Sequence, residues 1–171
     1  ADLTSVGGLS GQFAGQVNGQ APITGTLLAT ATGPAVRIRA ADGGAVLRAA
    51  EVFRTAYGGE MELVLQGTGA PGTYDGTLSI ESPRLRDAPV MAELLNLISV
   101  VGLLEQLGGE GINLGDVDAA FRLTPQQLIL TEGTAVGPAL GLSMDGIYTL
   151  TTRELDMQGV VSPLYIVNGL V

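Results

Sequence analysis

The side chains of this sequence that could carry chemistry are mainly carboxylates. Asp116 and Asp118 lie two residues apart, and Glu60 and Glu62 have the same spacing. Residues two apart on a strand share one face, so each pair could bind a cation or act as the two carboxylates of a glycosidase. The same spacing is common at solvated edges of a sheet, and we favour that interpretation for both pairs.

The sequence contains no His and no Cys. This excludes His-based acid–base catalysis, Ser-His-Asp triads, Cys nucleophiles and the nitrogen and sulfur ligands of zinc sites. The stretch Asp42-Gly43-Gly44 could surround a phosphate, but no Lys or Walker pattern follows it, so the start of a helix is the favoured interpretation. We therefore expect no enzymatic activity, no metal and no cofactor.

The chain is acidic. Its 171 residues include 17 acidic and eight basic residues, all of the latter Arg, which gives a formal net charge of −9. Nucleic-acid binding draws on clustered positive charge, so we expect no nucleic-acid partner, and anionic surfaces should repel the chain. The length predicts one domain with its own core, and the absence of Cys is compatible with both cytosol and periplasm.

The element around which the chain is organised is a long apolar stretch, residues 87–109. A helix is expected over residues 89–107, with its cap at Asp87 or Ala88 and a left-handed end at Gly108-Gly109. The helix is apolar around most of its circumference. A membrane span needs about 20 apolar residues, but charged residues near both ends argue against one, so burial against a sheet is favoured.

Most of the remaining sequence alternates apolar and polar residues, which is typical of strands with one solvated face. Residues 1–41 indicate lead-in strands, and Asn18-Gly19 predicts a hairpin turn between two of them. A second helix is expected over residues 43–57, capped by Asp42 and ended by Gly58-Gly59.

Each predicted helix is followed by a pair of strands, which suggests an internal repeat of about 45 residues. We expect one domain over residues 1–171: lead-in strands (1–41), a helix with a strand pair (42–86), and the central helix with further antiparallel strands (87–171). The predicted fold class is mainly β with two helices. Its strands should form a long antiparallel meander curled into an open trough, with the helices packed on or plugging its apolar face.

Three groups of residues form a recognisable pattern within residues 42–171. They are Asp87-Ala88-Pro89 at the start of the central helix; Gly137-Pro138, Gly141 and Asp145-Gly146 in a hairpin; and Gly159-Val160-Val161-Ser162-Pro163 followed by Tyr165 and Asn168. This pattern resembles the C-terminal region of AsmA-like proteins. The resemblance implies a bacterial protein that is anchored in the inner membrane by an N-terminal helix, projects into the periplasm, and carries phospholipid towards the outer membrane along an apolar groove.

The chain departs from that pattern because it lacks the anchor, most of the groove-forming body and the Gly-rich continuation after Asn168. The resemblance therefore implies a C-terminal piece of a longer parent chain. Its expected partners are phospholipid or an acyl chain, the remainder of the parent chain, and the inner membrane through the missing anchor. Its expected role is in outer-membrane biogenesis.

Two hypotheses of function remain open, with a glycosidase-like enzyme as a third. In the first, the module binds acyl chains along an apolar groove, where each buried methylene contributes about 0.8 kcal/mol. In the second, the same residues form a closed core, and the sheet edges dock a partner or the rest of the parent chain. The residues expected to line or seal the groove are Leu63, Leu65, Leu78, Ile80, Leu94, Leu95, Ile98, Phe121, Leu123, Leu128 and Leu130.

Overall fold

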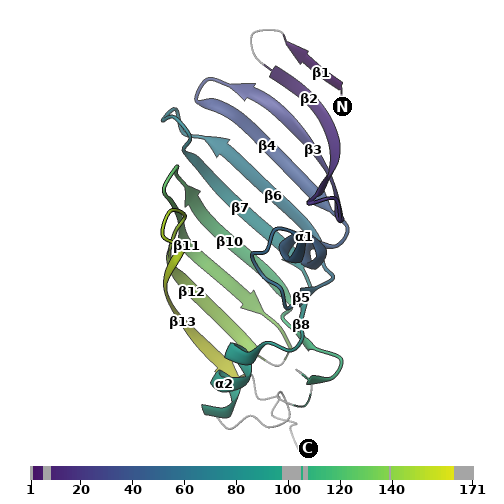
Figure 1. Cartoon of the computed structure of the whole chain (residues 1–171), viewed down its shortest axis with the longest axis vertical. Helices are drawn as coiled ribbons and strands as arrows, with labels where there is room; N and C mark the ends of the chain where they lie inside the picture. The colour runs from purple at the N-terminus through teal and green to yellow at the C-terminus, as the bar shows by residue number, and fades with distance from the viewer. Residues whose placement is uncertain (1, 6–8, 98–104, 106–107, 139, 164–171) are drawn as a thin grey trace, which may run out of the picture.

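The computed structural model of the chain describes residues 2–5, 9–97, 105, 108–138 and 140–163. It is mainly β, as predicted, and ten of the described strands form one antiparallel sheet whose spatial order follows the sequence (Figure 1). In spatial order these strands are β1 (Asp2–Ser5), β2 (Leu9–Val17), β3 (Ala21–Thr30), β4 (Gly33–Ala40), β6 (Glu60–Gly67), β7 (Tyr74–Glu81), β10 (Asp116–Leu123), β11 (Gln127–Val136), β12 (Leu140–Thr149) and β13 (Glu154–Pro163).

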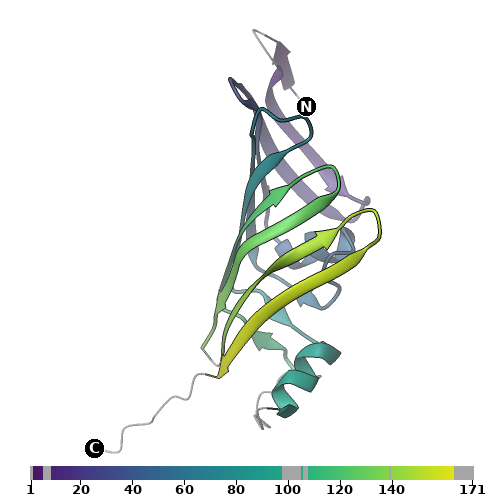
Figure 2. The ribbon, with the colours of Figure 1, turned by 90° about the vertical axis from the view of Figure 1, so that its left-hand side faces the viewer.

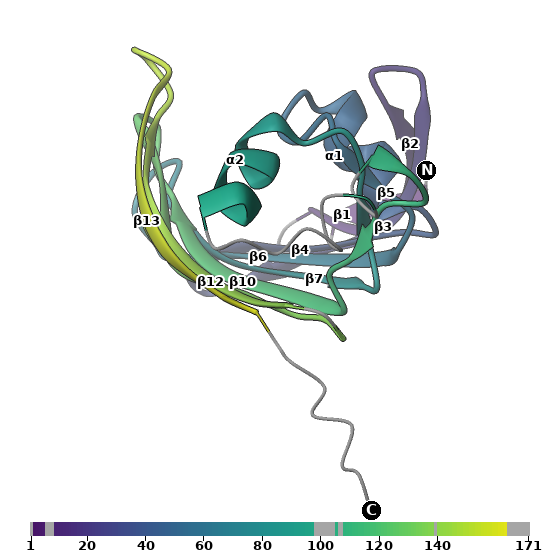
Figure 3. The ribbon, with the colours of Figure 1, turned by 90° about the horizontal axis from the view of Figure 1, so that it is seen from below.

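The other described elements lie on one side of this large sheet. They are helix α1 (Gly43–Ala49), helix α2 (Pro89–Leu97) and a small sheet of β5 (Ala56–Tyr57), β8 (Arg84–Leu85) and β9 (Ile112–Asn113). Seen from below, the large sheet curves around both helices, and the side view places them on the same concave side (Figures 2 and 3). The predicted open antiparallel trough with helices packed on it is confirmed.

Each helix precedes the same series of elements. α1 is followed by β5 of the small sheet and then by the paired strands β6 and β7. α2 is followed by β9 of the small sheet and then by the paired strands β10 and β11. This shared order agrees with the internal repeat that the sequence suggests.

The first helix is shorter than the sequence predicts. α1 ends at Ala49 instead of Tyr57, because Glu51 adopts a left-handed backbone with φ of 59°. The amides of the next two residues both donate to the Leu47 carbonyl, at 3.1 and 3.2 Å, which closes the last turn. Phe53 and Tyr57 have helical spacing in the sequence, but both are exposed in the structure. The helical spacing of apolar residues alone therefore overestimated the length of this helix.

The start of α1 agrees with the prediction, and its predicted end takes another role. Asp42 Oδ1 accepts a hydrogen bond from the Ala45 amide at 2.7 Å, which caps the helix. The amides of Gly43 and Gly44 donate to the carbonyls of Gly59 and Gly58, at 2.6 and 3.0 Å. Gly58-Gly59 therefore holds the N-terminus of α1 and connects β5 to β6, instead of ending the helix.

The central helix begins at Pro89, as predicted, and its described part ends at Leu97. Ala88 occupies the cap position, since its carbonyl accepts from the Ala92 amide at 2.9 Å. Asp87, the other predicted cap, has a positive φ of 48° and lies one residue before that position. Most of the predicted continuation to residue 107 lies outside the described residues.

The glycines after the central helix differ from the prediction. Gly108 and Gly109 do not have positive φ, and the first described glycine after them that does is Gly111, with φ of 92°. The left-handed turn therefore comes later, immediately before β9. No helix in the described part of the chain has the length and apolar character that crossing a membrane requires.

Candidate functional site

One face of the large sheet is apolar across its whole width. Residues directly opposite each other in an antiparallel pair point to the same side. Leu63 on β6, for example, is opposite Ile38 on β4 and Leu78 on β7. Following these pairs from β2 to β13 defines one face without any Asp, Glu or Arg among the described residues, which we call the apolar face.

One part of the apolar face is covered. Ala40, Met61 and Ile80 lie in neighbouring strands, are at most 6 % exposed, and form a buried cluster against which Val46 and Leu47 of α1 pack. Two glycines allow the helix to come this close. A Cβ at Gly43 would lie 2.8 Å from Met61 Cβ and 3.0 Å from Ile80 Cγ2, and Gly44 is pressed against the backbone of Tyr57.

The covered area continues onto β10, β11 and β12, at the strand ends that lie beside the cluster under α1. A second buried cluster joins Leu85 and Ile112 of the small sheet to Met91 of α2 and to Ala135 and Leu140 of the large sheet. Leu47 packs against both clusters and so connects them. We call the area under these two clusters the closed part of the apolar face.

The rest of the apolar face is only partly buried. At the opposite strand ends, its large side chains belong to neither buried cluster, and none is fully buried. We call this area the open part. Its large residues on β6 to β13 are Leu65, Tyr74, Phe121, Leu123, Leu128, Leu130, Met144, Tyr148, Leu155 and Met157.

Large side chains of the open part lie flat across glycines of the neighbouring strand. Gly76 is opposite Phe121, and a Cβ at Gly76 would lie 2.5 Å from Phe121 Cε2. Gly146 is opposite Met157, and a Cβ there would lie 2.7 Å from Met157 Cγ. This arrangement keeps the Phe121 ring and the Met157 side chain close to the backbone of the neighbouring strand.

The predicted groove residues divide between these parts. Ile80 is 1 % exposed and lies in the closed part, so it helps to seal the apolar face and does not line an open groove. Leu63 and Leu78 lie at the boundary, because they are partly buried and pack against the cluster under α1. The predicted residues in the open part are Leu65, Phe121, Leu123, Leu128 and Leu130.

Three predicted residues cannot be assigned to either part. Leu94 and Leu95 belong to α2, but the structure describes only their backbone, and Ile98 is not among the described residues. Sequence reasoning also left out Met144, Tyr148 and Met157, although the same alternation that found Leu128 and Leu130 continues into β12 and β13.

The opposite face of the large sheet carries the charges. Arg39 Nε donates to Glu62 Oε2 at 2.7 Å, with Arg37 Nε 3.6 Å from Glu62 Oε1, and Arg122 Nε donates to Asp75 Oδ1 at 2.7 Å. The hydrogen bond from Arg39 lowers the pKa of Glu62, and that from Arg122 lowers the pKa of Asp75. All these side chains are well exposed, so the pairs contribute little to stability.

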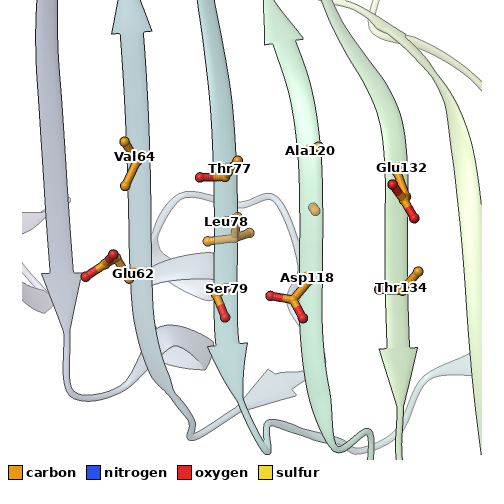
Figure 4. A pocket seen from close by; sticks show the side chains of 10 residues that line it. Glu62, Val64, Thr77, Leu78, Ser79, Asp118, Ala120, Glu132 and Thr134 are labelled. Atoms are coloured by element: carbon orange, nitrogen blue, oxygen red, sulfur yellow. The ribbon is translucent and has the colours of Figure 1, made fainter.

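The two acidic pairs of the sequence also lie on this charged face. Figure 4 shows Glu62 and Asp118 on different strands around a hollow of about 350 Å³ that spans β6, β7, β10 and β11. Glu62 is already engaged by Arg39, and no three described His, Cys, Asp or Glu residues are placed to hold a metal ion. The carboxylates therefore form a solvated face in the middle of the sheet, rather than the expected edge.

No protein-family model, curated protein or solved structure matches this chain.

Proposed function

We propose that this chain is a non-enzymatic lipid-handling module whose open part binds the acyl chains of phospholipid. The observation that carries the proposal is a continuous apolar surface, without charged side chains, that the described helices leave partly exposed. Soluble proteins rarely expose large contiguous apolar patches unless the patch binds something. Each methylene of an acyl chain transferred from water to this surface would contribute about 0.8 kcal/mol.

The dimensions of the open part suit an acyl chain. Its residues form rows that run across the strands, such as Leu65, Gly76, Phe121 and Leu130 on β6, β7, β10 and β11. The same row continues through Gly146 on β12 to Met157 on β13. Adjacent strands lie about 4.8 Å apart, so the row across these six strands extends roughly 24 Å between its first and last strand. Half of a bilayer hydrocarbon core of about 30 Å is the length of one acyl chain, so the row is long enough to hold one chain along its whole length.

The chemistry of the chain favours binding over catalysis. Among the described residues of β2 to β13, the apolar face offers only the hydroxyls of Tyr74 and Tyr148 as polar side-chain groups, and the described carboxylates of these strands lie on the opposite face. Without His or Cys, no general base or nucleophile of the usual kind could reach a lipid held there. The sequence resemblance to AsmA-like proteins supports the cellular part of the proposal, phospholipid transport across the periplasm by an inner-membrane-anchored parent chain.

Uptake of a fluorescent fatty acid by delipidated protein tests this proposal. Leu130→Asp places a charge in the open part, and Ile129→Asp places the same charge on the preceding residue of β11, which points to the opposite face. Both side chains are partly buried, so the two variants are matched for stability cost. We expect uptake to fall at least tenfold in Leu130→Asp only. Equal uptake by both folded variants would contradict the proposal.

A second candidate function, docking of a partner at a sheet edge, is favoured by one observation. Strand β13 forms an edge of the large sheet and exposes the large apolar side chains of Leu155, Met157 and Val160. The two functions are compatible, because strand pairing uses the outward backbone groups of β13 and leaves the side chains of Leu155 and Met157 on the apolar face.

A further inference from the structure

The edge strand β13 presents apolar side chains on both faces. Among the described residues it pairs only with β12. Leu155 and Met157 point to the apolar face and are 65 % and 40 % exposed, whereas Val160 points to the opposite face and is 62 % exposed. A long apolar edge of this kind can pair with another strand through its outward backbone groups.

The second half of this edge lacks several of the usual protections. Edge strands commonly carry a Lys, an interior Pro or a β-bulge. β13 has no Lys, and its one Pro is the last residue, Pro163. Its register with β12 is continuous, whereas the β10–β11 and β11–β12 ladders each contain a shift.

The length of the edge favours a second β13 as its partner. The other edge of the sheet, β1, has four residues, whereas β13 has ten. Pairing of β13 with β1 of another copy would leave most of β13 unpaired. Of the two described edge strands of the large sheet, only β13 is long enough to pair with β13 of another copy along its whole length.

Charge then selects the direction of pairing. Glu154 and Asp156 lie in the first half of β13, and residues 157–163 carry no charge. A parallel pair would place each carboxylate next to its copy, which is destabilising. An antiparallel pair places both carboxylates opposite the uncharged half of the second copy.

The alternation of faces selects the register. Pairing centred on Gln158 joins residues 154–162 of one copy to the same residues of the other and keeps the apolar faces on one side. Met157 then lies opposite Gly159 of the second copy, as it already lies opposite Gly146 within its own chain. Leu155 lies opposite Val161 of the second copy, so the apolar contacts are continuous across the junction.

We propose that two copies of this chain associate through antiparallel pairing of β13, centred on Gln158, and thereby join their apolar faces into one continuous surface. The second copy contributes its own Leu155 and Met157 to that surface. The association goes beyond acyl-chain binding and does not require it. Its test measures mass and cross-linking rather than uptake, so failure of either proposal can be recognised separately.

Sedimentation velocity of the delipidated chain, from micromolar to about millimolar concentration, tests the association. We expect a monomer–dimer equilibrium that strengthens with salt, because each copy carries a formal net charge of −9 and salt screens their repulsion. A monomer throughout this range, at low and high salt, would overturn the proposal. Assemblies that grow beyond a dimer would also overturn it, because antiparallel pairing of two edges is a closed contact.

Single cysteine substitutions test the register, since the chain contains no Cys of its own. Gln158→Cys lies on the proposed two-fold axis and should form a disulfide-linked dimer under mild oxidation. Asp156→Cys and Val160→Cys are the matched controls, since each would lie roughly 13 Å along the strand from its copy and should not cross-link. Equal cross-linking at all three positions would indicate parallel pairing, and cross-linking at none would indicate another contact, and either result would overturn the register.

Charges of opposite sign introduced at Val160 distinguish the proposed antiparallel contact from other contacts. Val160 lies opposite Asp156 of the second copy, so Val160→Asp should weaken dimerisation at least tenfold, whereas Val160→Lys should preserve or strengthen it. Leu28→Asp is the control, because Leu28 is equally exposed but lies on the interior strand β3. Loss of the dimer in both Val160 variants, or in neither, would contradict the antiparallel arrangement.

Discussion

Ile80 and Leu130 lie on the same face of the same sheet, yet their surroundings differ. Ile80 is buried beneath α1 at 1 % exposure, whereas Leu130 is partly buried and belongs to neither buried cluster. The difference does not come from the strands, which alternate in the same way around both residues. It comes from the cover, because Gly43 lets α1 pack against Met61 and Ile80, whereas Leu130 belongs to neither cluster of buried residues.

The comparison teaches that one apolar surface can serve two purposes. Where helices and the small sheet cover it, burial stabilises the fold. Where they do not, the same residue types expose the surface that we propose as the acyl-chain site. Substitutions that act on only one of the two parts can therefore separate stability from binding.

The largest difference between the parts should appear on truncation of their side chains. Ile80→Ala removes a fully buried side chain and should cost about 2–5 kcal/mol of unfolding free energy. Leu130→Ala should cost roughly half as much or less, because its side chain is already partly hydrated. Urea denaturation of both variants measures the difference, and equal losses would show that the open part is as tightly packed as the closed part.

The next effect should come from the approach of α1. Gly43→Ala introduces a Cβ 2.8 Å from Met61 Cβ and should cost about 1–3 kcal/mol, because helix and sheet must separate. Gly15→Ala is the control on the same face, where an added Cβ meets no atom within 4 Å, and its cost should stay within about 0.5 kcal/mol. Similar losses in the two variants would mean that α1 does not depend on close contact at Gly43.

A smaller effect is expected at the glycine beneath Phe121. Gly76→Ala places a Cβ 2.5 Å from Phe121 Cε2, so the ring must lift into the open part. The expected cost to stability is about 1 kcal/mol, together with weaker uptake of a fluorescent fatty acid. Unchanged uptake would show that a flat Phe121 ring is not needed for binding.

The smallest effect should be that of acid on the charged face. Glu62 and Asp75 have folded-state pKa values below their ordinary 4.5 and 3.8, so their ion pairs stabilise the fold above those values and lose that contribution as pH falls through the lowered pKa values. Arg122→Gln should remove the part due to Asp75. Because both groups are exposed, stability measured from pH 6 to pH 3 should differ only slightly between this variant and the natural chain.

The sequence predicted the faces of the strands well, because the alternation of Leu63, Leu65 and Leu78 with polar residues survives in the register of the sheet. It overestimated α1, because Phe53 and Tyr57 have helical spacing without being buried. It could not separate the closed part from the open part. That division depends on which strand ends the helices reach, and local periodicity contains no such information.

The most direct test of the account is to find where a bound acyl chain lies. A fatty acid with a photoreactive diazirine near its methyl end can be cross-linked to the delipidated chain, and the labelled residues identified by mass spectrometry. We expect labels on open-part residues such as Leu65, Phe121 and Leu130, and none on Ile80 or on Ile129 of the opposite face. Labels distributed equally over both faces, or confined to the charged face, would contradict the assignment of the open part as the acyl-chain site.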